Sequence, residues 1–230
     1  MPRGARILVD GGTYHVITRG NNGQPVFHGN PDFQHYLQLL SGYLEEYRLK
    51  LYHFVLMPNH VHLVLEVDLG KALSKAMLGL NLSYTWYYRK RYRYTGHLWQ
   101  GRFKSLLIDR DSYLLECGRY VELNPVRAGL ATSPDRYAWS SFRAYAEGVE
   151  YSFLALAHHP LYVTLGASSR EQQERYRQFV LDGLRMTTPF GPSPGRLDGR
   201  ILPAPGISIE KRLGIPIRRQ QQPAPTDHER

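Results

Sequence analysis

Alternating apolar and polar positions in the first part of the chain predict three strands and one helix. Residues 13–19 are rich in β-forming side chains and end in a Gly-Asn-Asn-Gly turn, which predicts a first strand. Residues 31–47 carry apolar side chains at helical spacing after an Asn-Pro start, which predicts a helix of about four turns. The strands predicted at 49–57 and 60–67 are separated only by Pro58-Asn59, so we expect an antiparallel hairpin.

The same kind of pattern continues through the middle of the chain and indicates a fold class. Residues 71–93 lack proline and place apolar side chains on one side, which predicts a long helix with a basic end. A fourth strand is predicted at 103–109 and another helix at 112–123. Strand, helix, hairpin, helix, strand and helix is the order of a ferredoxin-like α+β sandwich, an antiparallel sheet with helices packed on it.

The remaining residues divide into one more helix and a tail of different composition. Apolar residues at helical spacing predict a C-terminal helix at 169–184. Residues 186–230 contain eight prolines and five glycines, a composition that disfavours a packed core and predicts a mostly disordered tail. We therefore expect one domain at 1–185, followed by this tail.

The second strand of the predicted hairpin carries a candidate metal site. His60 and His62 alternate with apolar residues, so both imidazoles are expected on one face of the strand. Same-face neighbours on a strand are about 7 Å apart at the backbone, which lets two rings lean onto one ion. The alternative is an exposed strand face that carries two polar residues. A third ligand would have to come from another element.

The helix predicted at 112–123 ends in residues that could complete this site. Tyr120 and Asn124 are four residues apart and are expected to face the same direction. Pro125 disfavours helical geometry in the residue before it, so Asn124 is expected at the end of the helix. An amide oxygen there suits a metal ligand and the phenol suits a nucleophile. An ordinary helix cap at Asn124 is the alternative.

The basic charge of the chain is concentrated in one region. The formal net charge is +9, and residues 71–110 contain nine Lys or Arg residues against one acid, a local excess of +8. Such an excess indicates a polyanionic partner, and aromatic residues between the cations could stack on unpaired bases. A solvated helix end with inward-packed tyrosines is the alternative for residues 86–94. The candidate DNA contacts are Arg19, Asn21, Arg89, Lys90, Arg91, Arg93, Arg102 and Lys104.

Cysteine content and hydropathy indicate a cellular location. Cys117 is the only cysteine, so no disulfide can form within the chain, and its apolar surroundings predict a buried side chain rather than a nucleophile. We recognise no signal peptide and no apolar run of about 20 residues that would span a membrane. A soluble protein of the cytoplasm is therefore expected, with no membrane partner.

Three ordered motifs resemble a known family. They are Met57-Pro58-Asn59-His60-Val61-His62, Trp99-Gln100-Gly101-Arg102-Phe103, and Arg119-Tyr120-Val121-Glu122-Leu123-Asn124-Pro125 with its continuation to Gly129. Together they resemble the single-tyrosine HUH transposases of small insertion sequences, and most closely the branch of REP-associated tyrosine transposases. The likeness extends from about Thr13 to about Asp182 and stops before the tail.

The resemblance implies an activity and a set of site residues. His60, His62 and Asn124 would hold a divalent ion, magnesium or manganese, and Tyr120 would attack DNA to form a 5′-phosphotyrosine intermediate. The partner would be single-stranded or hairpin DNA with REP-like sequences, in the nucleoid of a bacterial cytoplasm, bound by a monomer or a homodimer. Many members carry glutamine where this chain carries Asn124.

Other functions fit parts of the same pattern. A domesticated protein that binds hairpin DNA without cleaving it would need the basic region but not Tyr120. A metal-dependent hydrolase, or a basic RNA-binding domain with structural histidines, is a third possibility. Hydrolysis is disfavoured because no carboxylate lies near His60-Val61-His62 in the sequence to activate water.

Overall fold

Four antiparallel strands form one open sheet in the order β2-β3-β1-β4. The computed structural model describes residues 8–108, 111–152 and 154–185. The strands are β1 (Thr13–Arg19), β2 (Leu49–Met57), β3 (His60–Val67) and β4 (Lys104–Ile108). The strand order and the two helical connections are those of a ferredoxin-like sandwich, so the predicted fold class is confirmed.

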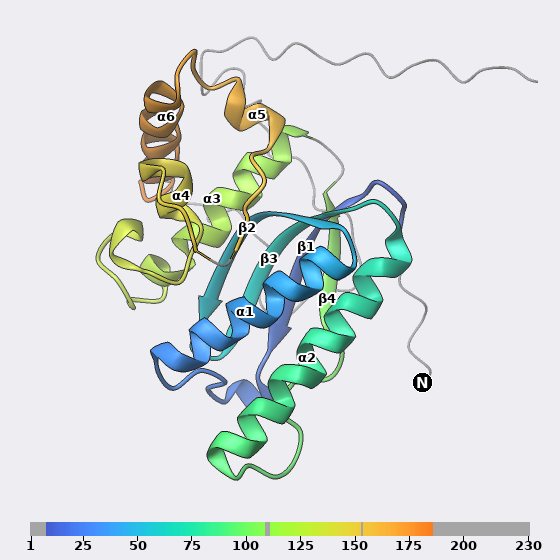
Figure 1. The fold of residues 1–230 in the computed structure, drawn as a ribbon. Coiled ribbons are helices and arrows are strands. Elements are labelled where there is room, and N and C mark those ends of the chain that lie inside the picture. Colours follow the sequence, from blue (N-terminus) through green and yellow to red (C-terminus); the bar gives the residue numbers. More distant parts are fainter. Residues whose placement is uncertain (1–7, 109–110, 153, 186–230) are drawn as a thin grey trace, which may run out of the picture.

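Helices cover both faces of the sheet (Figure 1). On one face, α1 (Asn30–Glu46) and α2 (Gly70–Tyr92) pack over the apolar side of the strands and enclose the main core. On the other face, α3 (Asp111–Arg127) packs on β2 and encloses a separate cluster that includes Val55, Val64 and Val121. His60 and His62 share the face of Val64, so they point toward the α3 side.

Three further helices follow α3. They are α4 (Phe142–Glu147), α5 (Pro160–Val163) and α6 (Ser169–Asp182), and they form a third apolar cluster with one side of α3. The predicted helix at 169–184 corresponds to α6. The two short helices and the 3-10 turn Pro134–Arg136 were not predicted, because elements this short have almost no periodic pattern. The 3-10 turn Asn21–Gly23 lies at the turn that the sequence predicts after the first strand.

The predicted end of α3 near residue 123 was wrong, since the helix continues through Pro125 to Arg127. Proline has no N–H group to bond the carbonyl four residues earlier, that of Val121. The side-chain amide of Asn124 donates to this carbonyl at 3.4 Å and to the carbonyl of Tyr120 at 2.8 Å. The asparagine side chain thus partly replaces the missing backbone donor and lets the helix continue for one more turn.

Three further expectations concern the tail, membrane-spanning helices and Cys117. The tail predicted at 186–230 lies outside the described residues. None of the helices within the described ranges combines the length and the apolar character needed to cross a bilayer. Cys117 is buried in the cluster under α3, as its apolar surroundings predict.

Candidate active site

The two histidines of β3 lie side by side on the α3 side of the sheet. Their ring centroids are 5.0 Å apart with an angle of 76° between the ring planes. His62 is buried at 4% exposure, whereas His60, at the start of the strand, is partly exposed. The strand pairing places His60 opposite Arg19 and His62 opposite Ile17 of β1. The histidine pair therefore lies where β1 and β3 meet at one end of the sheet.

A hydrogen bond fixes which nitrogen of His60 carries the proton. Nδ1 of His60 is 2.6 Å from Oδ1 of Asn59, and the Nδ2 group of Asn59 donates to the carbonyl of Gly23 at 3.0 Å. The second bond orients the amide so that its oxygen faces His60. An amide oxygen can only accept, so Nδ1 of His60 is the donor and Nε2 keeps a free lone pair.

A third histidine, His15 of β1, packs against His62 and was missed in the sequence. Its Nε2 atom is 2.8 Å from Nδ1 of His62, and the two rings stack with centroids 5.0 Å apart. His15 is completely buried, and its Nδ1 atom has no hydrogen-bond partner among the described residues. The signal was present, because a ferredoxin-like strand order puts β1 beside β3 and His15 shares the face of Arg19.

Burial keeps all three imidazoles neutral near pH 7. Burial, with a smaller contribution from Arg19, lowers the pKa of His60 to about 4. Burial lowers the pKa of His15 to about 3, and burial together with the two other histidines lowers the pKa of His62 well below its ordinary value. Neutral imidazole is the form that binds a metal ion.

Tyr120 of α3 faces this histidine group. Its ring centroid is 5.9 Å from that of His62 and 6.0 Å from that of His15, in edge-on contacts. Burial and the neighbouring Cys117 raise the pKa of Tyr120, whereas Arg127 and a side-chain hydrogen bond with Asn124 lower it. The guanidinium carbon of Arg127 is 5.8 Å from the ring centroid. The phenol is thus mostly enclosed, with one cation beside it.

The donor set fits a divalent ion, although it is not a cluster of three acidic, cysteine or histidine ligands. In the described part of the chain no three His, Cys, Asp or Glu side chains are grouped to hold a metal. His60 keeps a free Nε2 lone pair, and the hydrogen bond of His62 likewise uses its Nδ1 atom. The amide nitrogen of Asn124 is turned to backbone carbonyls, which leaves its oxygen for another partner. Two neutral imidazoles and an amide oxygen would leave open positions for phosphate oxygens.

Four candidate DNA contacts lie near this end of the sheet, and two of them share the face of the histidines. Arg19 ends β1 directly opposite His60, and Asn21 follows on the adjacent 3-10 turn. Lys104 opens β4 opposite Ile17, on the histidine side of the sheet. Arg102 and Lys104 are exposed. Arg19 and Lys104 thus form a cationic border next to the histidines, on the same face of the sheet.

The basic end of α2 is organised differently from a free stacking platform. Tyr87 and Tyr92 donate hydrogen bonds to Asp32 of α1 at 2.9 and 2.7 Å, and Arg91 pairs with the same carboxylate at 3.3 Å. Tyr88 is buried. Tyr87 is half-buried and Tyr92 remains 37% exposed although both are tied to Asp32, and Trp86 is 69% exposed.

The other cations at this end of α2 have different surroundings. The ammonium group of Lys90 lies 5.4 Å from the ring of Trp86. Arg89 donates to the carbonyl of Gly96 at 2.6 Å, and Arg93 ends the helix in a left-handed conformation with φ of 50°. Both arginines are exposed.

Comparisons with known proteins bear on the fold and on the family. One solved structure, of a REP-associated tyrosine transposase bound to a REP hairpin, aligns with a TM-score of 0.55 and 18% identity over 69% of this chain and 94% of that one. A putative transposase from Deinococcus radiodurans R1 aligns with a TM-score of 0.37 and 16% identity over 56% and 91% of the two chains. No curated protein sequence matches. The family described as "Transposase IS200 like" matches residues 9–124, half of the chain, and the protein therefore belongs to the IS200-like transposases.

Proposed function

We propose that this protein is a metal-dependent transesterase that cuts and rejoins one strand of hairpin-forming DNA through Tyr120. The observation that carries the proposal is the packing of the Tyr120 ring against His62, within 5.9 Å between centroids. A phenol that could act as the nucleophile is then in contact with one of the two proposed histidine ligands. Membership of a transposase family supports a reaction on DNA.

The reaction would conserve the energy of the phosphodiester bond. The phenolic oxygen of Tyr120 would attack the scissile phosphorus, and the 3′-oxygen would leave, so that the protein carries a 5′-phosphate ester. Attack by a DNA 3′-hydroxyl on this ester would rejoin the strand and release the phenol. Arg127 would stabilise negative charge on the phenolic oxygen in both directions, since its guanidinium lies beside the ring.

A divalent ion, magnesium or manganese, would polarise the scissile phosphate and is assigned to His60, His62 and Asn124. Asn59 holds the ring of His60 in the tautomer that a ligand needs. The hydrogen bond between His15 and His62 would do the same for the second ligand. Arg19 and Lys104, on the border of the site, would hold the phosphates on either side of the cut.

Hairpin DNA with a single-stranded flank is the proposed substrate. A protein of the same fold has been solved with a REP hairpin, and the motifs of this chain resemble the REP-associated branch. Exposed cations such as Arg102 and Lys104 support binding to a phosphate backbone. A protein that binds hairpins without cleaving them would not need Tyr120 to face the histidines.

The test is the formation of a covalent adduct. Full-length protein is incubated with labelled hairpin oligonucleotides and manganese or magnesium, and the products are separated on a denaturing gel. We expect an adduct from the wild type, none from Tyr120→Phe, and an unchanged amount from Tyr113→Phe, a buried tyrosine of the same helix. A chelator should abolish the adduct and leave hairpin binding within about tenfold, because phosphate contacts supply most of the affinity.

Two results would contradict the proposal. An adduct that persists in Tyr120→Phe would exclude this residue as the nucleophile. No adduct from wild-type protein with hairpins that it binds tightly would favour a protein that acts by binding alone.

A further inference from the structure

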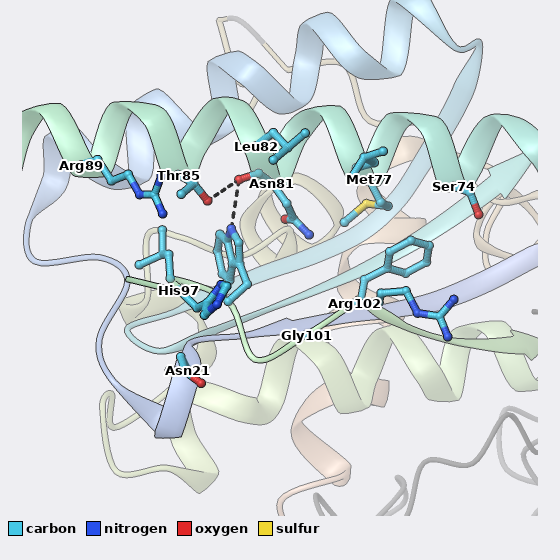
Figure 2. Close-up of a pocket in the computed structure, with 14 residues that line it drawn as sticks. Asn21, Ser74, Met77, Asn81, Leu82, Thr85, Arg89, His97, Gly101 and Arg102 are labelled. Carbon is cyan, nitrogen blue, oxygen red and sulfur yellow. Dashed lines mark hydrogen bonds between the residues drawn. The ribbon is translucent and has the colours of Figure 1, made fainter. Parts of the chain in front are cut away.

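A pocket of about 670 Å³ opens between α2 and the loop at 97–103 (Figure 2), and its lining includes none of His15, His60 and His62. One face of α2 forms its roof, and the loop forms its floor. The lining residues are Asn21, Ser74, Met77, Leu78, Asn81, Leu82, Thr85, Arg89, His97, Leu98, Trp99, Gly101, Arg102 and Phe103. The volume is within the usual range of small-molecule sites, about 300–1,000 Å³.

The pocket combines apolar walls with cations and has no acidic residue in its lining. Leu78 and Leu82 remain 61% and 60% exposed, although their side chains border a formed pocket. Arg89 and Arg102 lie at the pocket as well and come from different segments of the chain, as Figure 2 shows. Flat apolar surface flanked by guanidinium groups matches a base joined to phosphates.

Hydrogen bonds hold the walls of the pocket in place and leave one acceptor unused. The backbone carbonyl of Asn81 accepts from the indole of Trp99 at 3.1 Å and from the hydroxyl of Thr85 at 2.6 Å. The side-chain oxygen of Asn81 is buried and has no hydrogen-bond partner among the described residues. An exocyclic amino group of a base is a donor that would satisfy this oxygen.

The floor of the pocket is joined directly to the strand that ends beside the histidines. The backbone N–H of Gln100 donates to the carbonyl of Arg19 at 2.8 Å, and that of Asn21 donates to the carbonyl of Leu98 at 2.8 Å. Arg19 is the residue opposite His60 in the sheet. Asn21, two positions after Arg19, lines the pocket. A DNA strand that leaves the active site past Arg19 would therefore pass directly to the pocket.

We propose that this pocket binds one unpaired nucleobase of the single strand that flanks the hairpin. The base stacks on the apolar wall formed by Leu82 and Trp99, and its amino group faces Asn81. Arg102 and Arg89 hold the phosphates next to it. This assignment rests on the proposed function, since it gives the same DNA substrate a second contact outside the site of cleavage.

The experiment measures hairpin affinity by fluorescence anisotropy with full-length protein in chelator, so that cleavage does not interfere. The probes are one stem-loop without extension and the same stem-loop with a short single-stranded extension on the 5′ or the 3′ side, each with normal or abasic nucleotides. For one of the two sides, we expect normal nucleotides to bind about tenfold tighter than abasic ones, the effect of stacking one base.

A matched pair of variants assigns this difference to the pocket. Leu82→Ser should reduce the difference between normal and abasic extensions to less than about threefold and leave the bare stem-loop unaffected. Leu69→Ser is the control, because Leu69 directly precedes α2, is similarly exposed at 62% and lies outside the pocket lining. This variant should keep the full difference between normal and abasic extensions.

Two outcomes would overturn the proposal. One is equal affinity for normal and abasic extensions on both sides of the stem, and the other is equal behaviour of Leu82→Ser and Leu69→Ser. Neither outcome affects the adduct with Tyr120, so the failure of the pocket and the failure of the proposed function can be told apart.

Discussion

The Nε2 atom of His15 lies 2.8 Å from the Nδ1 atom of His62, and both imidazoles are buried. Each ring can donate in this pair, depending on where the protons reside. When His62 donates through Nδ1, its Nε2 lone pair is free for a ligand, as in His60. When His15 donates instead, Nε2 of His62 carries the proton and cannot bind a metal. A metal ion would therefore select the first arrangement.

We predict that His15→Ala weakens manganese binding about tenfold or more, because the second partner of a ligating histidine sets its tautomer and orientation. Isothermal titration of the protein with manganese alone measures this effect. His15→Gln should retain more affinity than His15→Ala, since its amide can place a hydrogen-bonding group near the position of Nε2.

The control for this prediction is His159→Ala, which removes a different buried histidine. Thermal melting of both variants identifies loss of folding. Manganese affinity that is equal in the wild type and His15→Ala would show that His62 needs no support from β1.

Among the described residues, Arg127 is the only cation in contact with the Tyr120 ring. Its guanidinium carbon is 5.8 Å from the ring centroid. We predict that Arg127→Gln slows adduct formation about tenfold, since a cation beside an aromatic ring contributes about 1–2 kcal/mol when partly desolvated. Arg127→Lys should recover part of the rate. The rate of adduct formation is measured with saturating DNA, so that a change in affinity does not contribute.

An exposed arginine away from the site provides the comparison. Arg136→Gln alters a side chain that is 78% exposed on a separate turn and should leave the rate unchanged. If both variants slow the reaction equally, the effect reflects net charge rather than the contact with Tyr120.

The sequence allowed the face of His60 and His62 to be predicted because the side-chain period of a strand is two. The same pattern puts His15 on the face of Arg19, but it does not give the contact with His62, since the register between β1 and β3 depends on the whole sheet. The sequence pattern also did not show that the side chain of Asn124 takes the place of the backbone donor that Pro125 lacks. The predicted end of this helix was therefore wrong.

Contacts between distant segments likewise limited how much of the candidate DNA-binding surface could be predicted from the sequence. Tyr87 and Tyr92 have the composition of a stacking platform, yet both hydroxyls are held by Asp32, which lies on another helix. The pocket under α2 depends on the loop at 97–103, which has no regular pattern to predict its course. The family motifs predicted the chemistry, and the packing of α3 on the sheet places Tyr120 beside the histidines.

Asp32 joins the basic end of α2 to α1 and gives the fold an acid-sensitive contact. Burial raises the pKa of Asp32, but hydrogen bonds from Tyr92, the N–H of His28 and Tyr87, together with Arg91, lower it below its ordinary value of 3.8 overall. A carboxylate with a lowered pKa stabilises the folded state above its unfolded pKa and loses this contribution as the pH falls through the folded value.

We predict that Asp32→Asn lowers the free energy of unfolding by about 2 kcal/mol at pH 7, because hydrogen bonds to a charged acceptor are the stronger kind. The difference from the wild type should shrink when the pH falls below about 4. Urea denaturation across this range measures both effects. An equal difference at pH 7 and pH 3 would show that the charge of Asp32 does not contribute.

Glu122 connects α3 to the sheet and to the C-terminal helices. It accepts hydrogen bonds from Nδ1 of His53 on β2 at 3.0 Å, from the hydroxyl of Ser141 before α4 at 2.6 Å, and from the hydroxyl of Tyr176 on α6 at 2.8 Å. All four side chains are buried. We therefore propose that residues 1–185 form one domain and unfold in a single transition.

Glu122→Gln should lower the free energy of unfolding by about 3 kcal/mol, because the new amide donor meets groups that themselves donate. Tyr176→Phe removes one donor to the carboxylate and should cost about 1–2 kcal/mol. Tyr162→Phe, which removes a neutral bond to the carbonyl of Tyr145 in the same cluster, should cost less. Denaturation followed by both tryptophan fluorescence and circular dichroism checks these values. If Glu122→Gln melts α6 in a separate early transition, the C-terminal helices are an independent unit and the one-domain proposal is wrong.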